Sequence, residues 1–221
     1  PTTHHALRQE DGTRSRLKDA VSLFFKEKVL LSTTLMFMLF NIGEGFLSVW
    51  LPIFSDRIFH GGAALYGLLL GAMAVGEVVG AFSAGSVVLP LSLGTLICLT
   101  QVLSGVSLGI LLLGRSIWMA VLGIALLGFF SAPLTIWAQT LRMHLIPEHL
   151  RGRTFALLRT LMQSSGPLAS GAVGMLLPIL GIPMVIGLSA LFIGVPGVLG
   201  YGVKQLRQPE QSVSAVEEEM R

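Results

Sequence analysis

The chain has 221 residues, of which 52% are hydrophobic and only 12% charged, and its formal net charge is +3. A water-soluble domain of this length normally carries about twice that charged fraction, so the composition excludes an ordinary soluble protein and indicates that lipid covers most of the surface. The small net charge gives no sign of nucleic-acid binding. The single cysteine, Cys98, excludes an internal disulfide and a cysteine-based metal site.

Residues 1–28 are polar and mixed in charge, with no secretory signal peptide and no initiator methionine. We expect either a trimmed start or a piece of a longer polypeptide. Apolar residues recur there at helical spacing beside basic ones, which predicts an amphipathic helix on the cytoplasmic face of the membrane; an ordinary linker is the alternative. The residues of this pattern are Arg16, Leu17, Lys18, Ala20, Val21, Phe24, Phe25 and Lys26.

Long tracts almost free of Asp, Glu, Lys and Arg follow. A hydrocarbon core of roughly 30 Å requires about 20 apolar residues in a helix, and the tracts predict six such helices. They are expected at residues 29–53, 64–86, 93–113, 117–141, 154–179 and 183–203. Pro90 and Pro178 lie where tracts too long for one helix must be divided. The predicted fold is an all-α, polytopic six-transmembrane-helix bundle over residues 29–203, with a disordered cytoplasmic tail at 204–221.

The basic residues predict the orientation of this bundle. Six helices return the chain to the side on which it started, and twelve of the fifteen Lys and Arg residues lie on that side. Arg57 and Arg115 lie on the other side, and Arg159 lies within a helix. By the positive-inside rule, both termini are expected in the cytoplasm, in a multi-pass protein of the cell (inner or plasma) membrane.

Three charged residues, Glu44, Glu77 and Arg159, are expected at membrane depth, where a charge costs about 3 kcal/mol or more. Glu44 shares a helix face with Asn41, and Arg159 shares one with Gln163. A carboxyl at this depth suits a group that takes up and releases a proton or that meets a cationic substrate. A structural hydrogen bond inside the bundle is the alternative for Glu44.

Glu77 and Arg159 each leave two interpretations open. Glu77 lies among small residues that let helices approach closely, so its carboxyl either serves transport or bonds to a neighbouring backbone or to Arg159. Arg159 either extends to the cytoplasmic surface or forms a buried pair with a glutamate, which would hold one conformation shut until protonation breaks it. The small residues around Glu77 are Gly67, Gly71, Gly76, Gly80 and Ala84.

Two further helices carry polar faces at helical spacing. Such faces line a water-filled cavity or form hydrogen bonds between helices, and both interpretations stay open. Trp50, Trp137 and the many methionines suit adaptable binding of a lipophilic molecule, or simple packing. The polar residues are Ser131, Thr135 and Gln139 in 117–141, near Trp137, and Thr100, Gln101, Ser104 and Ser107 in 93–113.

The connection after the fourth expected helix reads Arg142-Met-His-Leu-Ile-Pro147-Glu148-His-Leu-Arg151-Gly152-Arg153-Thr-Phe155. It resembles the Pro-x-x-x-Arg-Gly-Arg-x-Phe segment between helices 10 and 11 of major facilitator superfamily transporters. The resemblance is closest to the drug-efflux branch that includes macrolide exporters and the enterobactin exporter. It extends loosely to the Gly-rich second helix and to Ser165-Gly166-Pro167, and so covers residues 14–207.

This resemblance implies a twelve-helix fold of two six-helix halves, in which the chain supplies helices 7–12 and the N-terminal half is its partner. It implies secondary active transport by alternating access, driven by proton exchange. Residues 86–92 carry no charge where the family often has a basic cluster, so no second cytoplasmic latch is expected. The residues that would form a cytoplasmic gate, or only orient the chain by their charge, are Arg142, Pro147, Arg151, Gly152 and Arg153.

The sequence argues against an enzyme. All five histidines lie outside the expected helices, and no His-Glu-x-x-His or Gly-rich phosphate loop with Lys occurs. We expect no catalytic residue, metal, cofactor or nucleic-acid partner. The expected partners are the lipid bilayer, protons and a small lipophilic molecule. The alternative to a proton-coupled exporter is a self-contained six-span channel or membrane scaffold.

Overall fold

Six long helices make up most of residues 21–86, 90–113 and 116–207, which the computed structural model describes. A 3-10 turn, η1 (Glu148–Leu150), joins the fourth of them to the fifth, and a short helix, α8 (Lys204–Arg207), follows the sixth. These described ranges contain no strand. The long helices are α2 (Lys28–Arg57), α3 (Gly62–Ser86), α4 (Leu93–Leu113), α5 (Ile117–Leu145), α6 (Arg151–Leu180) and α7 (Ile182–Tyr201).

The helices fall where the apolar tracts predict them, and the all-helical fold is confirmed. Within the described ranges, five of them are long and apolar enough to cross a membrane: α2, α3, α4, α5 and α7. The sixth, α6, is as long as α2 but is the least apolar of the six, because it carries three arginines and a polar face. A sixth membrane crossing by α6 therefore stays a prediction.

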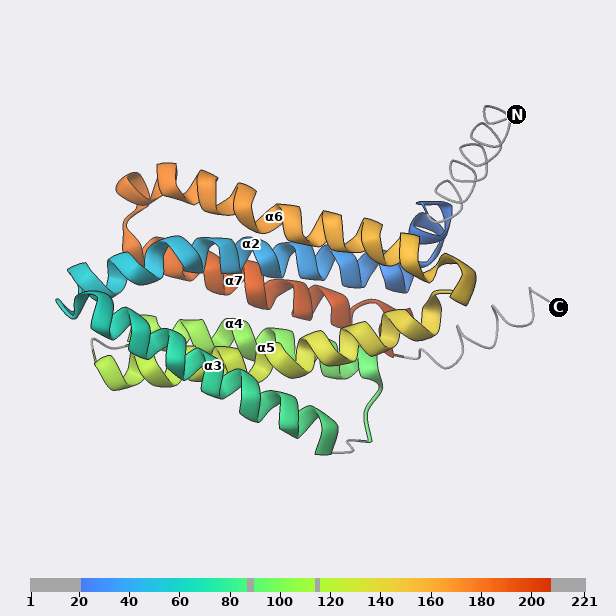
Figure 1. Cartoon of the computed structure of the whole chain (residues 1–221), viewed down its shortest axis with the longest axis horizontal. Coiled ribbons are helices and arrows are strands. Elements are labelled where there is room, and N and C mark those ends of the chain that lie inside the picture. The colour runs from blue at the N-terminus through green and yellow to red at the C-terminus, as the bar shows by residue number, and fades with distance from the viewer. Residues whose placement is uncertain (1–20, 87–89, 114–115, 208–221) are drawn as a thin grey trace, which may run out of the picture.

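The helices form two groups of three. In one group α3 and α4 pack along α5, and in the other α6 and α7 pack along α2. The groups meet mainly where α4 packs against α7, whereas α2 and α5 barely touch. Figure 1 shows the α2–α6–α7 group above the α3–α4–α5 group, with the start of α2, the end of α7 and the turn from α5 to α6 at the same end of the molecule.

Close approach of backbones at glycine holds each group together. A Cβ added at Gly76 or Gly80 of α3 would overlap the backbone of α5, at the carbonyl oxygens of Ala125 and Phe129. In the other group, a Cβ at Gly45 of α2 would overlap the carbonyl oxygen of Gly166 in α6. The predicted small-residue contact of α3 is therefore confirmed for Gly76 and Gly80. Gly67 and Gly71 meet nothing within 4 Å.

The segments outside the bundle are described only in part. Residues 21–26 are helical, and their Phe24 is buried while Phe25 is exposed, but residues 14–20 of the predicted amphipathic helix lie outside the described ranges. The predicted disordered tail begins instead with α8, whose Leu206 is buried at Gly94 of α4. Residues 204–207 are thus ordered by packing, and residues 208–221 lie outside the described ranges.

Candidate functional site

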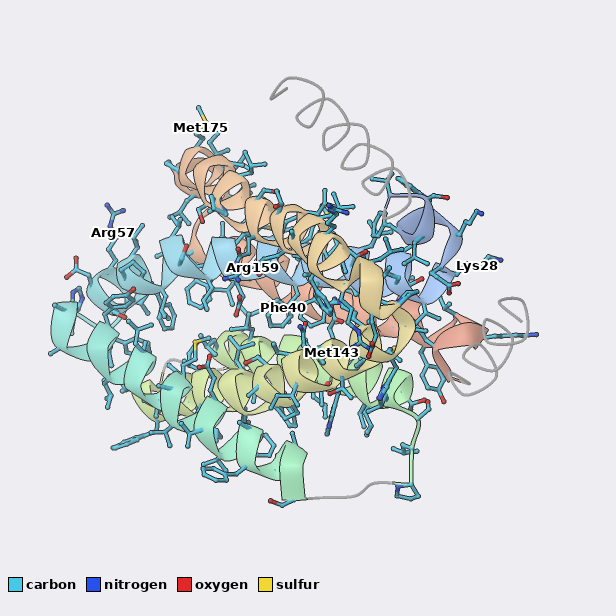
Figure 2. The ribbon with its side chains drawn as sticks, turned by 45° about the vertical axis from the view of Figure 1, so that its right-hand side comes forward. Lys28, Phe40, Arg57, Met143, Arg159 and Met175 are labelled. Atoms are coloured by element: carbon cyan, nitrogen blue, oxygen red, sulfur yellow. The ribbon has the colours of Figure 1, made fainter. Side chains whose placement is uncertain are left out.

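A cavity of about 900 Å³ lies between the two groups of helices, where α2 and α6 face α3 and α5. Figure 2 labels Phe40 of α2 and Arg159 of α6, which line it from one side. Most of the polar residues predicted at membrane depth meet here. The lining residues are Phe37, Phe40, Asn41, Glu44, Glu77, Val78, Ala81, Ser131, Ala132, Thr135, Ile136, Gln139, Arg142, Phe155, Arg159, Met162 and Gln163.

Both predicted carboxylates line the cavity, from different helices. Glu44 of α2 is half-buried, and Glu77 of α3 is exposed to the open space. Asn41, one turn before Glu44, donates from Nδ2 to the Phe37 carbonyl at 2.9 Å. Neither glutamate forms an ion pair with any residue that the structure describes, where Arg151–Glu148 is the one such pair.

Arg159 lines the same cavity but does not pair with a glutamate. Its Nε donates to Gln163 Oε1 at 3.2 Å, and the side chain is exposed. Ser170 donates to the carbonyl of Gly45 at 2.9 Å, which places Glu44 level with the middle of α6. Arg159 lies about ten residues nearer the start of α6, or roughly 15 Å along the axis. The predicted buried pair is therefore absent from this conformation.

Arg142 lies inside α5 and not in the loop where the sequence placed it, because α5 continues to Leu145. The side chain is only 3% exposed. Its Nη2 donates to the Thr33 carbonyl at 3.2 Å, and its guanidinium carbon lies 4.5 Å from the centroid of the Phe37 ring. Nε is buried and has no hydrogen-bond partner within the described ranges. Arg142 therefore bridges α5 to α2 at one end of the cavity.

The polar faces of α4 and α5 divide between the cavity and the packed interior. Ser131, Thr135 and Gln139 of α5 line the cavity. Gln101 of α4 does not, because it is fully buried and donates from Nε2 to the Met36 carbonyl at 3.1 Å. Trp137 packs against the apolar core. The polar face of α5 therefore lines the cavity, whereas Gln101 is buried between helices and Trp137 packs against the apolar core.

The remaining residues of the predicted gate form the turn from α5 to α6. Arg151 donates from Nε to the Ile146 carbonyl at 3.2 Å and forms an ion pair with Glu148 at 3.3 Å. Pro147 precedes η1, and Gly152 and Arg153 lie in the first turn of α6. Arg151 therefore ties the end of α5 to the start of α6.

The cavity walls include apolar side chains that the sequence reasoning did not select. Phe37 and Phe40 recur with Asn41 and Glu44 at helical spacing on α2, and this periodicity was the signal that could have identified them. Phe155 and Met162 continue the apolar wall on α6. In the described part of the chain, no three His, Cys, Asp or Glu side chains gather where a metal ion could be held. Charged, polar and apolar side chains therefore line the same cavity.

Comparison with known proteins identifies the family. The family model described as Major Facilitator Superfamily matches residues 1–170, which is more than half of the chain. No curated protein and no solved structure matches the chain. In the described part of the chain, five helices of spanning length and apolar composition agree with this assignment. The chain belongs to the Major Facilitator Superfamily of membrane-spanning secondary transporters.

Proposed function

We propose that the chain forms helices 7–12 of a proton-coupled exporter of the drug-efflux branch, which carries small lipophilic compounds outward by alternating access. The observation that carries the proposal is the cavity of about 900 Å³ between the two helix groups, lined by both membrane-depth carboxylates. The volume suits a drug-sized molecule. In the proposed transporter, the N-terminal six-helix half covers the remaining side of this cavity.

Glu44 is the proposed proton carrier. It lies about sixteen residues inside α2, or roughly 24 Å from Lys28 along the axis, and so near the far side of the hydrocarbon core. A carboxyl there gains by binding a proton when the cavity is dry and by releasing it when water enters. Glu77 lines the same cavity. Exchange of a proton for substrate at Glu44 is how the proton gradient would drive substrate outward.

The basic residues indicate which end of the cavity faces the cytoplasm. The described residues at the end shared by the start of α2 and the α5–α6 turn include Lys26, Lys28, Arg151 and Arg153, whereas Arg57 lies at the opposite end of α2 (Figure 2). By the positive-inside rule the basic end is cytoplasmic, with both termini there, in the cell membrane. Arg142 would close the cytoplasmic end of the cavity against α2 when the transporter opens outward, and Arg151 would hold the adjoining turn.

Everted membrane vesicles test this proposal. A lipophilic fluorescent dye should accumulate in vesicles that carry the protein when the lumen is made acidic, and a protonophore should abolish the accumulation. Glu44→Gln should remove proton-driven accumulation while dye exchange across the membrane persists, because exchange requires no net proton movement. The matched control is Asp56→Asn, which changes an exposed carboxylate near the end of α2, outside the cavity. Dye movement that survives the protonophore unchanged would instead indicate a passive channel.

A further inference from the structure

The charges of the cavity are separated along its length. The guanidinium of Arg142 lies over Phe37, one turn from its bond to the Thr33 carbonyl. Arg159 lies at the same end, because Ser165, six residues after it, bonds to the Met38 carbonyl of α2. The two glutamates lie further along. From Phe37 to Glu44 is seven residues, or roughly 10 Å of helix.

Neither end of the cavity is neutralised from within the part of the chain that the structure describes. In that part of the chain, no carboxylate lies within ion-pair distance of Arg142 or Arg159. No lysine or arginine there forms an ion pair with Glu44 or Glu77. Arg142 is the stronger case, because it is 3% exposed and its buried Nε has no hydrogen-bond partner among the described residues. A buried cation without a counter-ion is costly, so an anion from outside this set of residues is expected beside it.

The wall between the charged ends is apolar and aromatic. Phe37, Phe40 and Met162 line it, so a molecule that spans the cavity meets a hydrocarbon-like surface between its two polar contacts. Arg159 and Gln163 add donors at the cationic end. A guanidinium binds a carboxylate or a phosphate through paired N–H donors, and a carboxylate binds an ammonium group.

We infer that the substrates are amphiphilic zwitterions: a carboxylate or phosphate binds at Arg142 and Arg159, an amine binds at Glu44 and Glu77, and an apolar body roughly 10–15 Å long lies between them. This inference rests on the proposed function, and it narrows the lipophilic compound proposed there to one with charges of both signs at its two ends.

Three probes with one apolar body test the inference: 8-aminooctanoate carries both charges, octanoate only the anion, and octylamine only the cation. Their binding is measured by titration calorimetry on the full chain in lipid nanodiscs. We expect 8-aminooctanoate to bind roughly tenfold more tightly than either single-charge probe, since each end contributes a charge-assisted hydrogen bond. Equal binding of the three probes, preference for a single-charge probe, or no binding of any of them would overturn the inference.

Variants assign the two ends. Arg142→Gln and Arg159→Gln should remove the advantage of 8-aminooctanoate over octylamine, and Glu44→Gln should remove its advantage over octanoate. A purely structural loss at Arg142 would weaken all three probes equally, and Arg159 is exposed, so its replacement breaks no buried contact. Arg57→Gln, at the far end of α2, is the matched control and should change nothing. If Arg142→Gln and Arg159→Gln both keep the full preference for 8-aminooctanoate over octylamine, the inference is overturned.

The binding result is separable from the transport result. Dye transport with no zwitterion preference would remove the inference and leave the proposed exporter intact. Zwitterion preference without proton-driven transport would remove the exporter and leave the binding site intact.

Discussion

Replacing Gly76 by alanine should destabilise the bundle by driving α3 away from α5. The added Cβ would overlap the Ala125 carbonyl oxygen and lie 2.9 Å from the Phe129 nitrogen and 3.0 Å from the Ala125 carbonyl carbon. All three atoms belong to backbone, so none can rotate away as a side chain would. Overpacking of this kind costs about 1–3 kcal/mol.

The same substitution at Gly71 gives the matched control. Gly71 lies on the same helix, and a Cβ there would meet nothing within 4 Å. Both variants gain the helix propensity of alanine over glycine, about 1 kcal/mol, so their difference isolates the helix contact. Gly71→Ala should therefore be neutral or stabilising, and Gly76→Ala should have a free energy of unfolding lower than that of Gly71→Ala by about 1–3 kcal/mol.

Equilibrium unfolding in mixed micelles, with a mild detergent and increasing SDS, measures this difference. Gly76 directly precedes Glu77, so a shift of α3 also displaces a cavity carboxylate, and the variant should reduce transport more than its stability loss predicts. Equal unfolding free energies for the two variants would refute the reasoning that close backbone contact at Gly76 joins α3 to α5.

Two further substitutions test interior hydrogen bonds. Trp50→Phe removes the 2.9 Å bond from Nε1 to Ser189 Oγ, which joins α2 to α7, and should lower the free energy of unfolding by about 1 kcal/mol. In a Ser189→Ala background, Trp50→Phe should lower the free energy of unfolding by less. An equal loss in both backgrounds would contradict the hydrogen bond between Trp50 and Ser189. Gln101→Leu removes a bond to Met36 together with a buried, unpartnered Oε1, so stability should change by less than about 1 kcal/mol. The variant should transport at the unchanged rate, and a loss of transport would indicate that Gln101 contributes to the substrate or proton pathway.

The helices were predictable because their signals are local. Tracts of spanning length with at most one charged residue predicted the positions of all six long helices, and Gly181, with φ of 76°, ends α6 beside the predicted break at Pro178. The end of α5 was placed four residues early, at residue 141. The charge of Arg142 predicted that a loop begins there. The residue instead lies inside the helix, because α2 supplies a carbonyl and an aromatic ring that contact its guanidinium.

The site was predictable only as far as single helix faces allow. Glu44 with Asn41, and Arg159 with Gln163, were grouped correctly because helical spacing fixes which residues share a face. Gln101 and Trp137 gave the same signal, a polar or aromatic side chain at membrane depth, yet they pack inside the bundle. Which face a neighbouring helix covers depends on contacts between helices, and a sequence read one helix at a time does not contain them.

The central claim is that the cavity between the helix groups is accessible to water and forms the transport site. Cysteine accessibility tests it directly, because the native Cys98 is buried and gives little background. Thr135 of α5 lines the cavity, and Val106 of α4 is 59% exposed but lies away from it. In vesicles, a membrane-impermeant thiol reagent should modify Thr135→Cys and not Val106→Cys, because lipid covers the second position. Equal modification of both, or modification of Val106→Cys alone, would contradict the account.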